Sequence, residues 1–598
     1  MATILWIATG IIALAKLAQF WGLYYGNTDD LAVDFQTMAI GPFQTAFGFA
    51  FQQARVHELL GISLYSFTMS LAGSGWYDLL NLSAFVGGSV LPVTAFYRYL
   101  STPVLQLYVI AYFSTLPLLF SYCPPYSYPT YMFAPLAFCG AALLLFDRSR
   151  DVRHASHRTA LIVLACVALF LALCGYEPVM LMSAAFIALH FWLSAARNHR
   201  SSLLRRPDVL AAIGVCVFYF ALYVGWRLLF PPSYNGVQPA FNLSVPQIAR
   251  VVGTLSLTSS IFARYWVPQM LVYDDFGHAH VSSQPLYAAF GARLFEHATV
   301  WQLVVVALTI AVTYKLVVSM CLHWSMARAV QVTALGVFAL FWPNALYAFI
   351  PKLSNLVLTG QLVTYTGTAF SQIGFSLLCT GLVTLAVVRS NSAIRAALAV
   401  IVAIVAAWAS LASFGFNRVS QVYVREQGAK WSVIHQLAAC RNQIPATLLD
   451  RVTAPRLWNF STAPMSWMDG SQYQHYWDRL ALKRYHLNSH FYLQPQAPPK
   501  PLTLLDYHLA EDGNLSGIVL GFAPDGIHFR EVFIIKDSSI VPPAEIATRD
   551  SKWLYQGPEN TTNCGDRLQI VRFTGSDLNL GTTQVYDLPS VDQLSPKS

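Results

Sequence analysis

The sequence is 598 residues long and strongly apolar: 55% of its residues are hydrophobic and only 11% are charged. A soluble globule of this size needs more charge to cover its surface, so the composition excludes that class. The formal net charge of +8 does not indicate nucleic-acid binding, because the arginines gather in short loops between apolar segments, as topology signals do. The composition predicts a polytopic membrane protein that contacts membrane lipids and no nucleic acid.

About eleven apolar segments follow one another along the chain, each close to the ~20 residues that a bilayer core requires. They are residues 2–22, 79–98, 104–122, 130–146, 159–175, 179–195, 208–230, 301–318, 330–350, 369–388 and 396–416. The first segment is apolar almost from its start, contains Lys16 and lacks a small-residue cleavage site. We therefore expect it to remain as a membrane span and not to be removed as a signal peptide.

The arginines of two loops predict the orientation of these spans. Residues 147–158 and residues 197–206 carry eight of them: Arg148, Arg150, Arg153, Arg158, Arg197, Arg200, Arg205 and Arg206. By the positive-inside rule both loops face the cytoplasm, so the turn at 175–178 between them faces the other side. Counting outward places the N-terminus in the cytoplasm. It places residues 24–78, residues 231–300, the loop around Lys352 and everything after about Phe416 on the external side.

The composition changes sharply after Phe416. Residues 417–598 are polar and contain alternating runs, such as 518–522 and 531–535, separated by Gly, Pro, Asp and Asn turn signals. We expect a helical start over 418–440 and then a β-rich α+β domain. The predicted fold is mainly α: a transmembrane helical domain over 1–416, with interfacial helices, and a soluble extracytoplasmic domain over 417–598.

Two sets of residues in this C-terminal domain leave alternatives open. Cys440 and Cys564 either form a disulfide, as a pair in an oxidising compartment can, or remain two buried thiols. Five aromatic residues either stack on sugar rings or belong to the core: Trp458, Trp467, Tyr473, Tyr476 and Trp477. The sequence decides neither question, and it indicates no oligomeric state.

Two long external loops carry polar residues that need a reason to be near a membrane. The loop at 24–78 begins with Asp29 and Asp30 directly after the first span, where a carboxylate near lipid is costly. Apolar residues interleaved with Gln and Thr follow, which predicts one or two helices lying along the interface. The loop at 231–300 is rich in charged and aromatic residues, and a loop of this length in a compact protein indicates function.

This layout and a few short motifs resemble the glycosyltransferase-C superfamily. The motifs are Thr28-Asp29-Asp30 after the first span, Gln52-Gln53-Ala54-Arg55 in the interfacial segment, Tyr176-Glu177 in the short external turn, and Pro351-Lys352 followed by Tyr365 in a late external loop. Within the superfamily the chain is most similar to the polytopic glucosyltransferases that modify bacterial O-antigen. The resemblance covers about residues 1–416, and the C-terminal domain resembles no family.

The resemblance implies an enzyme of the bacterial inner membrane. It would transfer a hexose or pentose from a polyprenyl-phosphate sugar to a glycan, a lipid-linked glycan or another cell-envelope acceptor on the extracytoplasmic side. The sequence does not name the sugar, or choose between O-antigen, arabinan, teichoic acid and pilin as acceptor. It does not indicate an inverting or a retaining outcome, and we expect no cofactor.

The residues of the external loops fit this chemistry. A sugar hydroxyl becomes a good nucleophile when a base takes its proton, and Asp29 or Asp30 is the candidate base. Negative charge develops on the departing phosphate, which needs cations. The candidate cations are Arg55, Lys352, Arg264 and Arg293, and the candidate residues of the acceptor cavity are Glu177, Tyr176 and Tyr365.

Several of these residues also have a purely structural interpretation. The acidic pair could cap an interfacial helix, Arg55 could extend toward lipid headgroups, and Lys352 could anchor a span end. Glu177 could be a solvated turn residue. Arg227 lies inside the seventh span, which indicates function or an ion pair with a partner that the sequence does not identify.

The loop at 231–300 also contains acidic and histidine residues. Arg264 or Arg293 could form an ion pair there with Asp274 or Asp275 instead of binding a ligand. The cluster of Asp274, Asp275, His278 and His280 has ligand types that a metal can use, but the His-x-His spacing is weak and no second ligand pair accompanies it. We therefore expect no metal.

Two other functions remain open. A transporter or flippase for lipid-linked glycans would show inverted repeats and charged residues at mid-membrane depth, whereas this chain has no repeat and its acidic residues lie outside the spans. An O-antigen polymerase or ligase would also handle polyprenyl-linked sugar, but it would rely on external arginines and not on an acidic pair.

Overall fold

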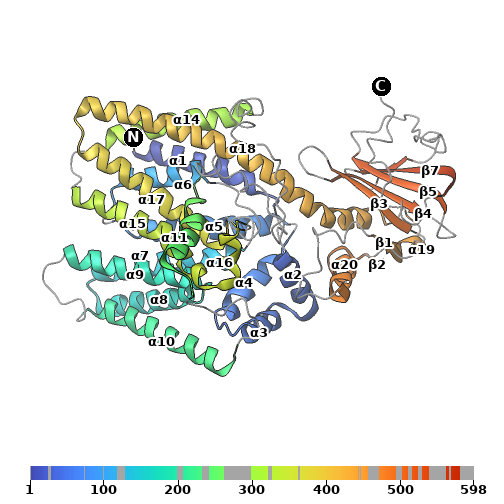
Figure 1. Cartoon of the computed structure of the whole chain (residues 1–598), viewed down its shortest axis with the longest axis horizontal. Helices are drawn as coiled ribbons and strands as arrows, with labels where there is room; N and C mark the ends of the chain where they lie inside the picture. The colour runs from blue at the N-terminus through green and yellow to red at the C-terminus, as the bar shows by residue number, and fades with distance from the viewer. Residues whose placement is uncertain are drawn as a thin grey trace. The chain divides into compact units, whose positions relative to one another are not determined.

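The computed structural model describes most of the chain. The described residues are 2–23, 28–72, 74–97, 100–116, 128–197, 206–231, 242–260, 298–320, 326–360, 362, 364–441, 444, 446–454, 470–492, 502–509, 515–522, 528–537, 561–563 and 568–579. They divide into two compact units, one formed by Met1–Val33 and Ile40–Ser420, the other by Asp34–Ala39 and Gln421–Ser598. Helices make up the first unit, and the strands, coloured orange to red in Figure 1, belong to the second.

The first unit is built from long apolar helices (Figure 1). Among the described residues, nine helical segments are long and apolar enough to cross a membrane. The helices that contain them are α1 (Ala2–Leu17) with η1 (Ala18–Phe20), α7 (Pro129–Asp151), α8 (Ala155–Leu173), α9 (Glu177–Arg197), α10 (Pro207–Leu229), α14 (Val300–Ser319), α15 (Met326–Ala345) with η5 (Leu346–Phe349), α17 (Thr366–Val388) and α18 (Ser392–Ala439). The prediction of a mainly helical, polytopic chain is confirmed.

Two of the eleven expected spans differ from the helices observed. The span expected at 79–98 is α5 (Gly75–Thr94), which begins earlier and is not among the nine segments; the Asp78 carboxylate in its first turn accepts a hydrogen bond from the Gly22 backbone N–H at 3.0 Å. The span expected at 104–122 is α6 (Thr102–Ser114), a shorter apolar helix. The count of eleven was therefore approximate.

Short helices connect and cover the long ones. The loop expected at 24–78 contains α2 (Thr28–Ile40), α3 (Pro42–Gln52) and α4 (Glu58–Ser70), so it holds three helices where one or two were expected. Helix α3 exposes Phe43, Phe47 and Phe51, which are four residues apart and so lie on one face. Two more short helices, α11 (Val245–Leu257) and α16 (Pro351–Leu358), pack with η5 in one apolar cluster.

Glycines let the long helices pack closely. A Cβ on Gly374 of α17 would lie 2.0 Å from the Leu340 backbone nitrogen of α15, and a Cβ on Gly140 of α7 would lie 2.5 Å from the Leu91 carbonyl carbon of α5. Neither position could carry a larger side chain without separating the helices. Small residues at helix contacts are typical of membrane proteins, where dispersion between closely packed backbones stabilises association.

A buried lysine joins α1 to α18. The Lys16 ammonium donates to the Ser410 carbonyl and to the Ser413 hydroxyl, both at 2.6 Å, and lies 3.2 Å from the centre of the Phe414 ring. The lysine side chain is fully buried. Its hydrogen bonds therefore tie the first helix of the chain to α18.

The second unit is an α+β domain, as predicted. It contains the end of α18, α19 (Ala446–Leu449), α20 (Gly470–Tyr485) and strands β1 (Arg451–Thr453), β2 (His490–Tyr492), β3 (Leu502–Leu509), β4 (Leu515–Phe522), β5 (His528–Asp537), β6 (Thr561–Asn563) and β7 (Leu568–Asn579). The strand order is β2-β1-β3-β4-β5-β7-β6. The strands from β3 onward pair antiparallel, whereas β1 is parallel to both of its neighbours.

The structure of this unit bears on both of the alternatives that the sequence left open. Tyr476 and Trp477 are fully buried, so these two aromatic residues belong to the core; the side chains of the other three lie outside the description. Cys440 is disulfide-bonded, and Cys564 lies outside the described residues.

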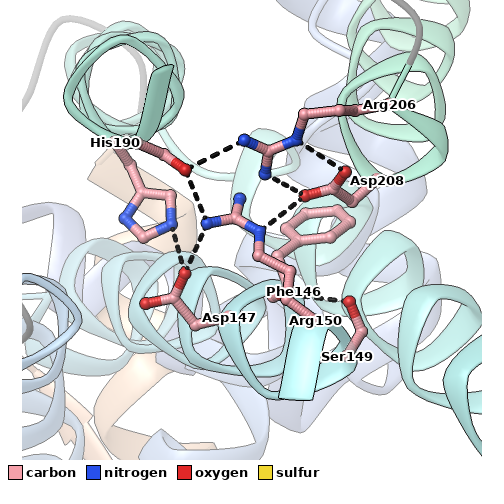
Figure 2. A network of polar contacts seen from close by, with 8 residues as sticks. Phe146, Asp147, Ser149, Arg150, His190, Arg206 and Asp208 are labelled. Carbon is pink, nitrogen blue, oxygen red and sulfur yellow. Dashed lines mark hydrogen bonds and ion pairs between the residues drawn. The ribbon is translucent and has the colours of Figure 1, made fainter. Parts of the chain in front are cut away.

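A network of charged side chains joins α7, α9 and α10 at one of their ends, as Figure 2 shows. The Arg150 side chain donates to Asp208 and to Asp147, each at 2.8 Å, and Arg206 donates to Asp208 at 2.7 Å. His190 lies 3.1 Å from the same Asp147 oxygen. The Ser194 hydroxyl accepts from both arginines at 2.9 Å. Two of the loop arginines used to predict topology are thus bound to carboxylates.

This network predicts the effect of removing its shared carboxylate. Asp208→Asn leaves Arg150 and Arg206 without the oxygen that accepts from both, so we expect a loss of roughly 2–4 kcal/mol of stability, reduced from the fully buried case by the partial exposure of the arginines. Unfolding of the purified protein in detergent would measure it.

The matched control is Arg148→Gln, which changes an exposed arginine of α7, the helix that carries Arg150. It should alter stability by no more than about 0.5 kcal/mol. Equal stability of Asp208→Asn and Arg148→Gln would show that the network does not hold the three helices.

Candidate functional site

An ion pair between two distant segments forms the centre of the candidate site. Arg55 lies in the turn between α3 and α4, and Glu177 is the first residue of α9. The Arg55 Nε lies 2.8 Å from the Glu177 Oε1, and both side chains are largely buried. The sequence analysis singled out both residues, and the structure brings them into direct contact.

A second carboxylate and a histidine share this centre. Glu58 begins α4, and its Oε1 lies 3.7 Å from the Arg55 Nη1 and 3.8 Å from the His57 Nε2. The same histidine nitrogen lies 3.7 Å from the Glu177 Oε2. Burial lowers the pKa of His57 to about 4, so this residue is neutral at physiological pH. One arginine therefore faces two carboxylates here.

Helix α10 brings a second cation to the site. The Tyr223 hydroxyl donates to the Glu177 Oε1 at 3.3 Å, and the Arg227 Nη1 donates to the Tyr223 hydroxyl at 3.3 Å. The Tyr223 ring also stacks on His57, with ring centres 6.1 Å apart. Arg227 had no identified partner in the sequence, and the structure connects it to Glu177 through this tyrosine.

Tyrosines extend the site away from the ion pair. The Tyr176 ring packs against Tyr131, with centres 5.8 Å apart, and lies 5.7 Å from the Arg55 guanidinium carbon. Tyr176 and Tyr347 are hydrogen-bonded, and Tyr347 meets Tyr365 edge to face at 5.1 Å. Tyr365 is thus joined to Tyr176 through one intervening ring.

The backbone next to Arg55 is held in an uncommon conformation. Ala54 has a φ of 53°, in the left-handed region that residues with a Cβ rarely adopt, and its side chain is fully buried. The Arg55 backbone N–H donates to the Ala50 carbonyl at 3.0 Å, and the Trp226 indole donates to the same carbonyl at 3.1 Å. Strain of this kind persists where surrounding contacts fix it, which is common at functional sites.

A glycine in α4, Gly61, also allows this helix to pack close to the site. A Cβ on Gly61 would lie 2.3 Å from the Tyr131 ring, so only glycine leaves room for this tyrosine beside α4. Because Tyr131 in turn supports Tyr176, the glycine fixes the wall of the site indirectly.

The site and the charged network of Figure 2 lie at opposite ends of the same helices. In α7 the site contributes Tyr131 and the network contributes Asp147, about 16 residues or roughly 24 Å farther along the helix. Helix α9 likewise contributes Glu177 to the site and Ser194, near its other end, to the network. Helix α10 contributes Tyr223 to the site and Asp208, near its other end, to the network. The separation is close to the ~30 Å thickness of a bilayer core.

The remaining candidate residues are placed unequally. Asp30 lies in α2 and is buried, whereas the side chain of Asp29 is outside the description. Lys352 is exposed on α16. Arg264 and Arg293 lie outside the described residues, as does the cluster at 274–280. Within the described part of the chain, no group of three or more His, Cys, Asp or Glu residues could hold a metal ion.

Sequence reasoning missed several members of the site. His57 and Glu58 come two and three residues after Arg55, so the run Arg-Val-His-Glu in an otherwise apolar loop was the signal available. Tyr223 lies four residues before Arg227, which is the spacing of neighbours on a helix face. Tyr131 and Tyr347 carried no local signal, because each lies in an apolar segment.

Comparisons with known proteins leave the family open. No protein-family model matches the sequence, and no curated protein is significantly similar to it. Among solved structures, the chain is similar to one described as "Crystal Structure of ArnT from Cupriavidus metallidurans bound to Undecaprenyl phosphate", with 12% identity, coverage of 88% of this chain and 99% of that chain, and a TM-score of 0.29. A TM-score this low does not establish a shared fold.

The buried histidine predicts how acid affects the protein. Its folded pKa of about 4 lies below the ordinary value of about 6.5, so the unfolded chain binds a proton that the folded protein does not. Stability is then complete above about pH 6.5 and falls by up to roughly 3 kcal/mol as the pH falls toward 4. Thermal unfolding at pH 7.5, 6 and 5 would measure this fall.

His57→Gln provides the control for this prediction. The amide does not titrate, so the variant should lose less stability than the wild type between pH 7.5 and 5. An identical pH dependence in the two proteins would contradict a neutral, buried His57.

Proposed function

We propose that this protein is a membrane glycosyltransferase of the glycosyltransferase-C type, which transfers a sugar from a polyprenyl-phosphate donor to a cell-envelope acceptor. One observation supports this most. Residues that the sequence analysis selected from two separate loops, Arg55, Tyr176 and Glu177, meet in one buried polar site. That site lies at the helix ends opposite the arginine-rich loops.

The proposed orientation follows from those loops. Arginine-rich loops face the cytoplasm, so the site would face the other side of a bacterial inner membrane, and the N-terminus would be cytoplasmic. The C-terminal domain would then be periplasmic. The disulfide of Cys440 supports this assignment, because disulfides persist in oxidising compartments.

The proposed reaction needs one base and several cations. The acceptor hydroxyl attacks the anomeric carbon, its proton passes to Asp29 or Asp30, and the bond between the sugar and the phosphate breaks. The electron pair of that bond leaves with the polyprenyl phosphate. No general acid is required, because the phosphate departs ionised, but nearby cations must offset its charge.

The candidate cations differ in their surroundings. Arg55 faces Glu177 and Glu58, so binding phosphate would require it to exchange a carboxylate partner. Lys352 is exposed on α16, between Ile350 and Leu353, which pack against the cluster that contains Tyr347. Arg264 and Arg293 complete the proposed set from the second loop.

The tyrosines are the proposed acceptor side of the cavity. Tyr176 and Tyr365 are joined through Tyr347, and aromatic rings with polar hydroxyls suit sugar rings, which have an apolar face and polar edges. Glu177 would hold Arg55 in place, and its remaining acceptor capacity would be available to a sugar hydroxyl.

The first test removes the proposed base. Asp29→Asn or Asp30→Asn keeps the shape of the side chain and removes the proton acceptor, so we expect one of the two to lower turnover on the order of 100- to 10,000-fold, with donor affinity unchanged. The assay measures sugar transfer and release of polyprenyl phosphate by purified protein with excess polyprenyl-phosphate sugar.

The same assay separates the alternatives. A flippase would move the lipid-linked sugar across vesicles without releasing polyprenyl phosphate, and a polymerase or ligase would keep its activity in both Asp variants. Wild-type turnover in both variants would remove the acidic pair from the mechanism.

The second test concerns the donor phosphate. A charge-assisted contact to phosphate contributes roughly 1.5–3 kcal/mol, so Lys352→Ala should raise the donor dissociation constant about tenfold to a hundredfold. Arg55→Lys is the informative change at the other position, because Arg55→Ala would leave two buried carboxylates without their cation.

Lys315→Ala is the control, since Lys315 is an exposed lysine that the same topology places at the cytoplasmic end of α14. Its donor affinity should match the wild type. If Lys352→Ala also matches the wild type within about twofold, the phosphate site lies elsewhere, and Arg264 and Arg293 become the candidates.

A further inference from the structure

Helix α2 carries a second buried carboxylate besides the candidate base. Asp34 is fully buried, and it lies one helical turn after Asp30. Residues four apart on a helix lie on the same face, roughly 6 Å apart along the axis. The mechanism proposed above does not use Asp34, so its burial needs another explanation.

The C-terminal unit supplies the partners of Asp34. The Tyr476 hydroxyl donates to the Asp34 Oδ2 at 3.0 Å, and the Arg484 guanidinium forms an ion pair with the Asp34 Oδ1. Both partners belong to α20. The Trp431 indole of α18 donates to the Tyr476 hydroxyl at 2.6 Å, so two helices of this unit orient the group that holds the aspartate.

Aromatic contacts strengthen the same attachment. The Phe35 ring lies 6.2 Å from the Tyr476 ring, and the Arg479 guanidinium carbon lies 5.2 Å from the centre of the Phe35 ring. Tyr476 and Trp431 are almost completely buried. Residues Asp34–Ala39 therefore pack as part of the C-terminal unit, although they are continuous in sequence with the first unit.

Helix α2 is thus shared between the two units. Its first turns, with Thr28, Asp29 and Asp30, belong to the first unit, and the following residues belong to the second. A helix is stiff over one turn because its backbone hydrogen bonds span four residues. Fixing Asp34 therefore restricts where Asp30, one turn earlier, can lie.

We propose that Asp34, held by Tyr476 and Arg484, is a positioning residue through which the C-terminal domain sets the location of the catalytic acidic pair. This inference rests on the proposed function, and it assigns the C-terminal domain a role in catalysis. Turnover then depends on α20, because a displacement of about 1 Å in a catalytic group can lower a rate 100-fold.

The experiment has a physical readout and a kinetic one. Arg484→Gln breaks the ion pair, so amide hydrogen exchange in residues 28–40 should become at least tenfold faster, while exchange in β3 to β5 stays unchanged. The turnover number should fall at least tenfold, and the donor dissociation constant should stay within twofold of the wild-type value.

Three further variants separate positioning from folding. Arg484→Lys retains the cation and should recover most of the lost turnover. Lys483→Gln changes the exposed neighbour of Arg484 on the same helix and should match the wild type. The double variant Asp34→Asn with Arg484→Gln should be no slower than the slower single variant, because both single changes break the same contact.

The outcomes distinguish this inference from the proposed function. Absence of sugar transfer by the wild type would refute the proposed function, whereas the exchange measurement would still test whether Arg484 fixes α2. Active wild type, with turnover and exchange in Arg484→Gln equal to those of Lys483→Gln, would overturn the positioning role. A lower yield of folded Arg484→Gln with wild-type turnover per folded molecule would also overturn it.

Discussion

A charge inside a low-dielectric bilayer must have a partner, and this constraint organises the first unit of the protein. Buried carboxylates of α7, α9 and α10, namely Asp147, Glu177 and Asp208, are each paired with a basic side chain, and they lie at the two ends of these helices. One end is closed by Asp208 with two arginines, and the other by Glu177 with Arg55. Since both groups bridge several helices, they fix the depth and the neighbours of each helix together.

The same constraint explains which parts of the site the sequence could predict. Arg55 and Glu177 stand out in apolar surroundings, so the sequence singled out both, but it assigned them to the donor phosphate and to the acceptor cavity and did not predict their ion pair. The contribution of α10 did not follow, because the hydrogen bonds that join Arg227 to Glu177 run through Tyr223, four residues earlier on the same helix. The sequence did not predict the tyrosine cluster, because Tyr131 and Tyr347 lie in apolar segments, where a tyrosine does not stand out from its neighbours.

The sequence predicted secondary structure where a hydrophobic pattern extends over many residues, and it did not where the pattern covers only a few. Long apolar runs predicted the helices, and alternating runs predicted β4 and β5. The parallel pair β1 and β2 was not predictable, because each strand has only three residues and α20 intervenes between them. The division of α2 between two units left no trace in the sequence either, because Asp34 resembles any polar residue of an external loop until Arg484 and Tyr476, 450 and 442 residues later, are placed beside it.

Lys16 has a consequence for how the protein is made. Its ammonium is satisfied by Ser410 and Ser413, and the first of these lies 394 residues downstream. During synthesis the first helix enters the membrane long before those partners leave the ribosome. Until α18 is made, the buried amino group of Lys16 lacks both of these acceptors, so the contact between α1 and α18 forms only after most of the chain has been translated.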